Sequence, residues 1–252
     1  MIGYLSFDPV FHRRVATNYD DFLNLVRGRR SIRRFKDKPV DRETVEKILE
    51  AARHAPSAAN SQPWEFVVVQ DAATKKTISK SIAQKLNDVL DADPTFNRNS
   101  AVQPHLFTAP VIIAVCGDPR LEDSYPMGKV MRNVLFRQSL ANCIYTIQLA
   151  AACFGLASAW ATIQGGPIEA EVKKVLGIPD SYTVDHIVPL GYPDEEAAER
   201  QPALRVIKDR APFRRELKEM VHYEHYDPSK FRSDEAIKEF ILGHTVTRIS
   251  GS

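Results

Sequence analysis

The amino-acid sequence predicts an α+β fold in which helices cover both faces of a mixed central sheet, giving three layers. Two segments carry this prediction. Val111 to Cys116 is wholly apolar, as expected of a central strand with both faces covered. The segment from about Met127 to Phe154 has the length of a long helix and is apolar almost all round, which indicates a helix buried against other layers.

The first elements follow from residues that start or end helices. Residues 19–27 have a short helical pattern, and we expect Gly28 to end this helix as a left-handed cap. Asp41 is expected to begin a second helix. Apolar residues recur at helical spacing from there to Ala52, and Pro56 closes the helix.

The later elements are predicted by the same reasoning. Strands are expected where apolar and β-branched residues stand between turn signals, at residues 64–70, 157–163 and 182–190. Helices are expected where apolar residues recur every three or four positions, at residues 78–89, 167–176, 213–220 and 234–242.

These patterns divide the chain into an N-terminal extension (residues 1–18), a core (residues 19–193) and a C-terminal arm (residues 194–252). The arm is polar and charged and has too few apolar residues to form a domain of its own. We therefore expect it to pack on the core or on a partner subunit.

Composition excludes several classes of protein. With 44% hydrophobic and 26% charged residues, the chain has an ordinary globular composition. A net charge of +2 is too small to predict binding to nucleic acid or to an anionic membrane. The three cysteines form no C-x-x-C pair, which argues against structural zinc, iron–sulfur clusters and disulfides. The first residues lack the order of a signal peptide, so we expect a soluble, cytoplasmic protein.

The first chemical motif is R-R-S-I-R-R-F, which follows directly after the first predicted helix. It contains a hydroxyl and four guanidinium groups at Ser31, Arg29, Arg30, Arg33 and Arg34. The planar arginine fork matches phosphate oxygens, so this set predicts a phosphate site. Taken alone, however, the motif favours a solvated basic turn over a phosphate site.

The second motif, P-S-A-A-N-S-Q-P-W, links the second helix to the first strand. Its small residues allow close approach by a flat ligand, and Asn60 and Gln62 offer both donors and acceptors, as the pyrimidine edge of a flavin requires. Alone, this is an ordinary loop. A third segment, K-D-R-A-P at residues 208–212, would by itself be surface charge.

Together, the order R-R-S-I-R-x-F, then P-S-A-x-N-S-Q-P-W about 20 residues later, then a late K-x-R-x-P resembles the FMN-dependent nitroreductase family. The resemblance covers roughly residues 20–223. It implies a nitroreductase-like fold with an extended C-terminal arm. It also implies an intertwined homodimer with two FMN sites at its interface, so that the monomer should hold flavin poorly.

The resemblance assigns roles residue by residue. Arg29, Arg30, Ser31 and Arg33 match the positions that hold the FMN phosphate, ribityl chain and ring edge. Lys208 and Arg210 match the cations of the C-terminal tail that complete the phosphate site. The loop against the flavin, contributed by the other subunit, is matched by Pro56, Ser57, Ala58 and Asn60. Gln62 either contacts the flavin or only stabilises this loop.

Two further positions of the resemblance are less direct. Gln164 and Gly165 match the stretch whose backbone N–H faces flavin N5, although a plain glycine turn after a strand fits them equally well. On the long helix, Ser139 and Thr146 stand where many relatives have an acidic residue and an asparagine. Roles borrowed from relatives for these two positions are therefore not carried over.

The function implied is transfer of reducing equivalents from NADPH or NADH through FMN to a small organic acceptor, such as a nitroaromatic or quinone, by a ping-pong mechanism. No catalytic side chain is expected, because the chemistry belongs to flavin N5. His54 and His186 are interpreted as structural. Two alternatives stay open: an enzyme that consumes its flavin, like benzimidazole synthases, and a non-catalytic flavin store or sensor. No metal is expected.

Overall fold

The structure is a computed structural model that describes residues 18–92, 109–163, 166–194 and 214–244. The chain separates into two compact units, Met1–Glu195 and Glu196–Ser252, which are described one at a time. The first unit contains the helices α1 (Tyr19–Gly28), α2 (Arg42–Ala52), α3 (Ala72–Ala92), α4 (Lys129–Cys153) and α5 (Pro167–Leu176). Its strands are β1 (Trp64–Val69), β2 (Val111–Gly117), β3 (Ala157–Ser158), β4 (Ala161–Thr162) and β5 (Thr183–Gly191).

The strands form one sheet in the order β1-β2-β5-β3, with β4 also paired to β5. All of these strand pairs are antiparallel. A parallel bridge between Ser31 and Ser158 adds the segment after α1 to the edge beside β3, which makes the sheet mixed as predicted. The segment from Arg29 onward is therefore attached to the sheet rather than free in solvent.

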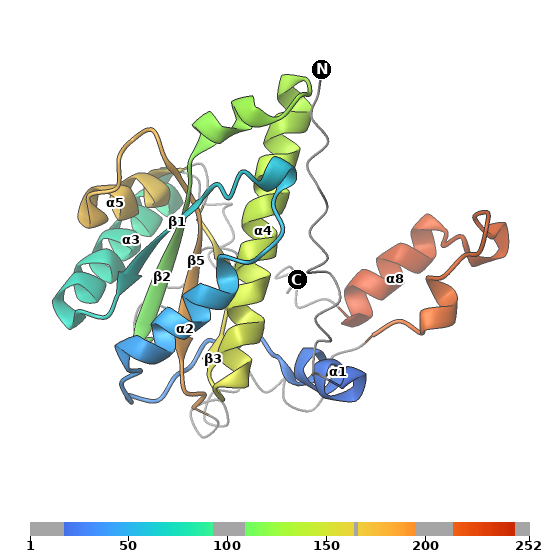
Figure 1. Cartoon of the computed structure of the whole chain (residues 1–252), viewed down its shortest axis with the longest axis horizontal. Helices are drawn as coiled ribbons and strands as arrows, with labels where there is room; N and C mark the ends of the chain where they lie inside the picture. The colour runs from blue at the N-terminus through green and yellow to red at the C-terminus, as the bar shows by residue number, and fades with distance from the viewer. Residues whose placement is uncertain (1–17, 93–108, 164–165, 195–213, 245–252) are drawn as a thin grey trace, which may run out of the picture. The chain divides into compact units, whose positions relative to one another are not determined.

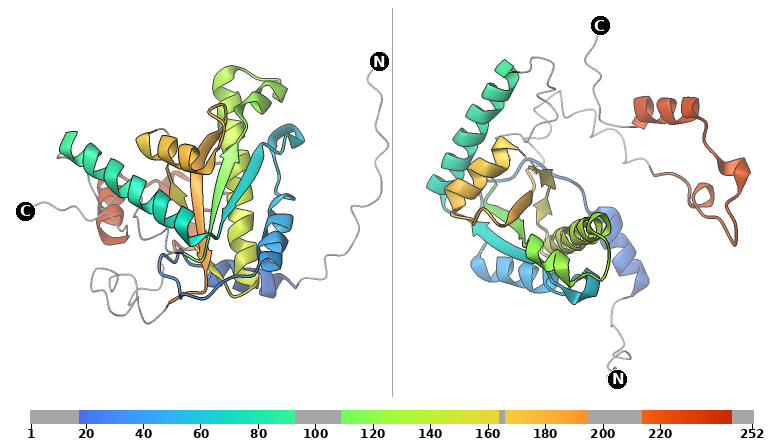
Figure 2. Two further views of the ribbon diagram at one scale, coloured as in Figure 1. Left: turned by 90° about the vertical axis from the view of Figure 1, so that its left-hand side faces the viewer. Right: turned by 90° about the horizontal axis from the view of Figure 1, so that it is seen from above.

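Helices cover both faces of this sheet (Figures 1 and 2), so the predicted three layers are confirmed. Residues of β2 alternate between the two layers: Val111, Ile113 and Val115 pack with α2 and α4. Their neighbours Ile112, Ala114 and Cys116 pack with α3 and α5. Every residue of β2 is buried, because both faces of this central strand are covered.

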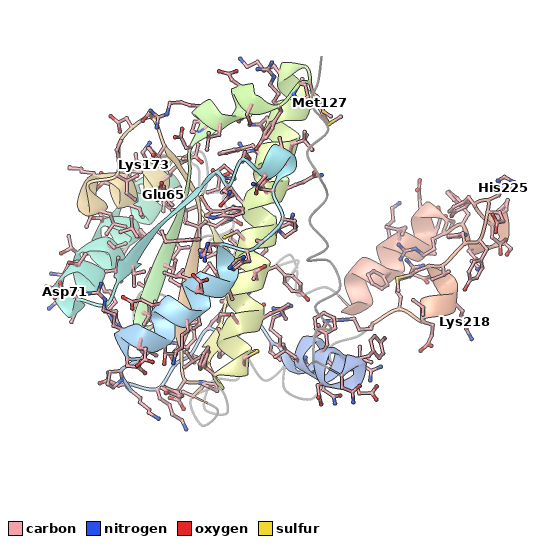
Figure 3. The ribbon with its side chains drawn as sticks, in the orientation of Figure 1. Glu65, Asp71, Met127, Lys173, Lys218 and His225 are labelled. Carbon is pink, nitrogen blue, oxygen red and sulfur yellow. The ribbon has the colours of Figure 1, made fainter. Side chains whose placement is uncertain are left out.

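Helix α4 has apolar residues on a side that no other described part of the first unit covers. Phe136, Leu140, Ile144 and Ile147 are buried against the sheet and α2. Five large apolar side chains remain exposed along another side of α4 and at its start: Met127, Val130, Met131, Val134 and Tyr145. We call these five residues the α4 stripe. Figure 3 labels Met127 where the stripe begins. The expected burial of this helix against other layers is therefore observed on the side that faces the sheet and α2, and the described part of the first unit leaves the α4 stripe uncovered.

Two local predictions are corrected. Gly28 is not a left-handed cap: it lies in the last turn of α1, and the helix ends because Arg29 is extended while its N–H donates to the carbonyl of Leu25. Left-handed glycines occur instead at Gly155 and Gly177. The expected strand at residues 157–163 is interrupted between β3 and β4, although both pieces keep one register along β5.

The second unit contains α8 (Asp234–His244), as predicted for residues 234–242. Within the predicted helix at residues 213–220, the described part forms only a 3₁₀ turn, Leu217–Glu219, and a second such turn spans Pro228–Lys230. No side chain from 214 to 240 is buried. None of the described helices in either unit is both long and apolar enough to cross a membrane.

Candidate functional site

The arginine-rich segment runs from the end of α1 along the edge of the sheet. The N–H of Ile32 donates to the carbonyl of Ser158 over 2.9 Å, and the N–H of Lys36 donates to the carbonyl of Tyr192 over 2.9 Å. A further bridge joins Phe35 to Pro193. These backbone bonds fix the segment, and the side chains of Ser31 and Arg33 are exposed on it.

Arg29 is half-buried, and part of its guanidinium is turned into the protein. Its guanidinium lies over the ring of Tyr145 on α4, 5.9 Å from the ring centroid. Its Nε–H is buried and has no hydrogen-bond partner among the described residues. A buried donor without an acceptor costs about 1–3 kcal/mol. Arg29 therefore lacks an acceptor, and a phosphate oxygen or a ribityl hydroxyl is an acceptor of the right kind.

The other three predicted members of the phosphate site differ in their surroundings. Arg30 donates to the carbonyl oxygens of Arg27 and Arg29, which turns part of its guanidinium back onto its own chain. Ser31 and Arg33 are exposed. The segment thus offers one buried donor without a partner, together with an exposed hydroxyl and an exposed guanidinium.

The second motif forms the loop of residues 56–62 between α2 and β1. Three of its residues that are not glycine have left-handed backbone angles: Ala59 with φ 52°, Asn60 with φ 52° and Gln62 with φ 45°. Such conformations cost about 1 kcal/mol or more each and persist only where the surrounding structure holds them. They are typical of functional loops.

Side chains outside and inside the loop hold it in this shape. The backbone carbonyl of Pro56 accepts a hydrogen bond from Asn142 Nδ2 over 3.1 Å, and the backbone N–H of Ala58 donates to Ser139 Oγ over 3.1 Å. Within the loop, the N–H of Gln62 donates to Ser57 Oγ over 3.0 Å. The loop is therefore fixed to the middle of α4.

A further anchor comes from the segment before α4, where the buried hydroxyl of Tyr125 lies 2.8 Å from Ser61 Oγ. The predicted members Pro56 and Asn60 are exposed, and Ser57 and Ala58 are half-buried. Gln62 donates through Nε2 to Asn60 Oδ1 over 3.3 Å, so it has a stabilising contact within the loop.

Both motifs contact α4 at different heights. The loop is bonded to Ser139 and Asn142, whereas Arg29 lies over Tyr145, about 4.5 to 9 Å further along the axis at 1.5 Å per residue. Among the described residues, no hydrogen bond joins the two motifs. Four predicted site residues lie outside the described residues: Gln164, Gly165, Lys208 and Arg210.

A polar cluster beneath α4 was missed by sequence reasoning. Arg137 donates to Asp185 Oδ2 over 2.8 Å, and Asp185 is only 1% exposed. Burial raises the pKa of Asp185, while the Arg137 guanidinium opposes this rise. The signal was an aspartate within a largely apolar strand, together with an arginine in the middle of a largely apolar helix. Beside this pair, Trp160 Nε1 donates to Nδ1 of His186 over 2.9 Å, so His186 has the structural contact that was expected.

The comparison with known families agrees with the two motifs. A sequence profile of the Nitroreductase family matches residues 26–192, more than half of the chain. The chain belongs to the nitroreductase family. The match includes the arginine-rich segment, the loop of residues 56–62 and every strand in the described part of the chain.

Individual relatives of this chain agree with the family assignment. It is 35% identical over 180 residues to an Archaeoglobus fulgidus protein provisionally named NADH dehydrogenase/NAD(P)H nitroreductase, covering 70% of this chain and 88% of the relative. It is 29% identical to the 5,6-dimethylbenzimidazole synthase of Rhodospirillum rubrum, covering 75% and 87%. An FMN-dependent nitroreductase of Clostridium difficile has a similar structure, with a TM-score of 0.56, 25% identity and coverage of 81% and 99%.

Proposed function

We propose that this member of the nitroreductase family is an FMN-dependent oxidoreductase. It carries reducing equivalents from NADPH or NADH to a small organic acceptor such as a nitroaromatic, a quinone or a related electrophile. The observation that carries the proposal is the buried Nε–H of Arg29, which has no acceptor although it belongs to an arginine-rich segment fixed to the sheet edge. An oxygen of a bound phosphate or ribityl chain would satisfy this donor.

The residues suit FMN as follows. Arg29, Arg30, Ser31 and Arg33 would hold the phosphate, ribityl chain and ring edge. Lys208 and Arg210 of the arm would complete the phosphate site, since arginine and lysine are the residues that bind phosphate. Pro56, Ser57, Ala58 and Asn60 of a second copy would lie against the flavin, with Gln62 holding Asn60 in place. Backbone N–H groups at Gln164 and Gly165 would face N5.

The second copy is part of the proposal. The α4 stripe exposes 83% of Val130 and half of Met131, which is unusual for large apolar side chains gathered on one helix. A stripe of this kind on the helix that carries the loop fits a homodimer in which α4 of one copy packs on the other. FMN would then lie at the interface, between the arginine segment of one copy and the loop of its partner.

When bound, FMN would supply the redox chemistry, taking a hydride from the nicotinamide and delivering two electrons to the acceptor. The chain's own residues would bind the cofactor and orient it toward its substrates. Arg33 would place positive charge at the ring edge, where it stabilises negative charge that develops during reduction. Both substrates would use one pocket in turn, so we expect ping-pong kinetics.

The first experiment is an absorbance spectrum of the purified protein, followed by anaerobic addition of NADPH and then NADH. We expect flavin absorbance near ~450 nm, a property of the cofactor itself, that bleaches with either nucleotide. The faster nucleotide identifies the donor. A colourless protein that takes up no added FMN would contradict the proposal and leave Arg29–Arg34 as a basic turn.

The same absorbance experiment distinguishes the proposed reductase from an enzyme that consumes its flavin and from a flavin store or sensor. One alternative is an enzyme that consumes its flavin, and its support is the 29% identity to the Rhodospirillum rubrum 5,6-dimethylbenzimidazole synthase. For a reductase, the absorbance returns fully when air is admitted, whereas consumption of FMN leaves a permanent loss. A flavin store or sensor would show the bands and no reaction with either nucleotide.

A further inference from the structure

The loop of residues 56–62 has a conformation that its own sequence does not favour. Ala59, Asn60 and Gln62 all have left-handed φ angles, and none of them is glycine. Alanine and glutamine adopt this region rarely. Bonds within the loop, such as that from the N–H of Gln62 to Ser57 Oγ, stabilise part of this shape, and side chains from outside the loop supply the rest and control where the loop lies.

Ser139 provides the most central of these contacts. Its side chain is 1% exposed, and its hydroxyl has two partners: it donates to the carbonyl of Leu135 over 2.8 Å and accepts from the N–H of Ala58 over 3.1 Å. Because the hydroxyl proton is donated to the carbonyl of Leu135, a lone pair of the oxygen is free to accept from the N–H of Ala58. This bond lies immediately before the left-handed residues.

Two other side chains attach the loop on either side of Ala58. Asn142 lies one helical turn after Ser139 and donates to the carbonyl of Pro56, while Tyr125 bonds to Ser61. The three anchors all belong to α4 or to the segment just before it. The loop therefore moves with α4, the helix that bears the exposed stripe.

We propose that Ser139 is a positioning residue that holds the loop ready for flavin before any flavin binds. This inference rests on the proposed function, in which the loop covers the flavin of the second copy. Because the loop is fixed to α4, docking of the α4 stripe on the partner also sets the distance from the loop to that flavin. Ser139 acts through the Ala58 amide and does not itself contact the cofactor.

The test compares Ser139→Ala with Thr146→Ala. Thr146 also lies on α4, and its hydroxyl donates to the carbonyl four residues earlier, that of Asn142, over 2.8 Å. Both variants therefore lose the same bond within the helix, but only Ser139→Ala loses the bond to the loop. Asn142→Ala is a second loop variant at an exposed position, where a failure to fold is not expected.

Two quantities are measured on dimeric, flavin-free protein. Titration with FMN, followed by quenching of flavin fluorescence, should give a dissociation constant about tenfold higher for Ser139→Ala, the effect of one lost hydrogen bond. Thr146→Ala should stay within about twofold of wild type. Hydrogen exchange should show a protected Ala58 amide in the wild type and in Thr146→Ala, and a fast-exchanging one in Ser139→Ala.

An unprotected Ala58 amide in the wild type, or equal FMN affinity in Ser139→Ala and wild type, would overturn the inference. Asn142→Ala should weaken FMN binding in the same direction, and an unchanged affinity there would count against fixation by α4. Wild-type protein that binds no FMN would instead overturn the proposed function. In that case the exchange measurement still decides whether Ser139 holds the loop.

Discussion

The indole of Trp160 donates a hydrogen bond of 2.9 Å to Nδ1 of His186, and the two rings meet edge to face at 5.1 Å between centroids. Because Nδ1 accepts, the neutral imidazole must carry its proton on Nε2. Burial, with a smaller effect of the nearby Arg137, lowers the pKa of His186 to about 4. The ring therefore remains neutral in the folded protein at physiological pH.

The first prediction concerns the stability of the fold against acid. An unfolded histidine has a pKa of about 6.5, so between about pH 6.5 and 4 the unfolded chain binds a proton that the folded chain does not. The contribution of His186 to stability is therefore full above pH 6.5 and is lost as the pH falls towards 4. For this half-buried ring we expect a loss of roughly 1–2 kcal/mol, less than the full shift would give.

Denaturant unfolding at pH 7 and pH 4.5 measures this loss. His186→Gln is the matched control, because the amide oxygen can still accept from Trp160 but does not titrate. The free energy of unfolding should fall less with pH in this variant than in the wild type. Identical pH dependence in the two proteins would show that His186 is not the responsible group.

The second prediction concerns the buried donor of the arginine segment. Arg29→Gln should raise the dissociation constant for FMN by about 10- to 100-fold, since it removes a charge-assisted hydrogen bond worth about 1.5–3 kcal/mol. Arg27→Gln removes the same charge two residues earlier, within α1, and should change affinity by less than about threefold through long-range attraction alone. Similar losses in both variants would indicate a general effect of positive charge and no specific site at Arg29.

The third prediction concerns the proposed dimer. Val130→Asp combined with Val134→Asp should produce a monomer that loses its flavin, because two charges would have to be buried in an apolar interface. Val130 lies in the first turn of α4, where an acidic residue is compatible with the helix dipole. Analytical ultracentrifugation gives the oligomeric state. Val68→Asp, at an exposed valine of β1, is the control and should leave the dimer intact.

The fourth prediction concerns two glycines with opposite surroundings. A Cβ at Gly117 would lie 2.5 Å from Phe136 Cζ and 2.8 Å from Leu140 Cδ1, so Gly117→Ala should destabilise the fold by about 1–3 kcal/mol. A Cβ at Gly28 would meet no atom within 4 Å. Because Gly28 is helical and not left-handed, Gly28→Ala should be neutral or stabilising by up to about 1 kcal/mol. Thermal or denaturant unfolding compares the two, and a clear loss in Gly28→Ala would contradict the helical assignment.

Much of this architecture could be predicted because its signals are local. Strand β2 is apolar without interruption, and the short helices have regular spacing and recognisable first residues, as at Asp41, whose side chain accepts from the N–H of Thr44. Each of the two motifs of the candidate site is an unbroken run of residues, so both can be found in the sequence without knowledge of the tertiary structure. Local patterns failed at Gly28, where the extended Arg29 ended the helix without a left-handed residue.

The sequence by itself determined the layers, the family and the residues expected to bind the cofactor. Tertiary structure alone decided how those residues are held. The bond from Ala58 to Ser139 joins positions 81 residues apart, and no local pattern predicts such a pair. Likewise, α4 is apolar almost all round, so its sequence contains no period that distinguishes the buried face from the exposed stripe. Only packing against α2 and the sheet makes that choice, because burial depends on which surfaces the rest of the chain supplies.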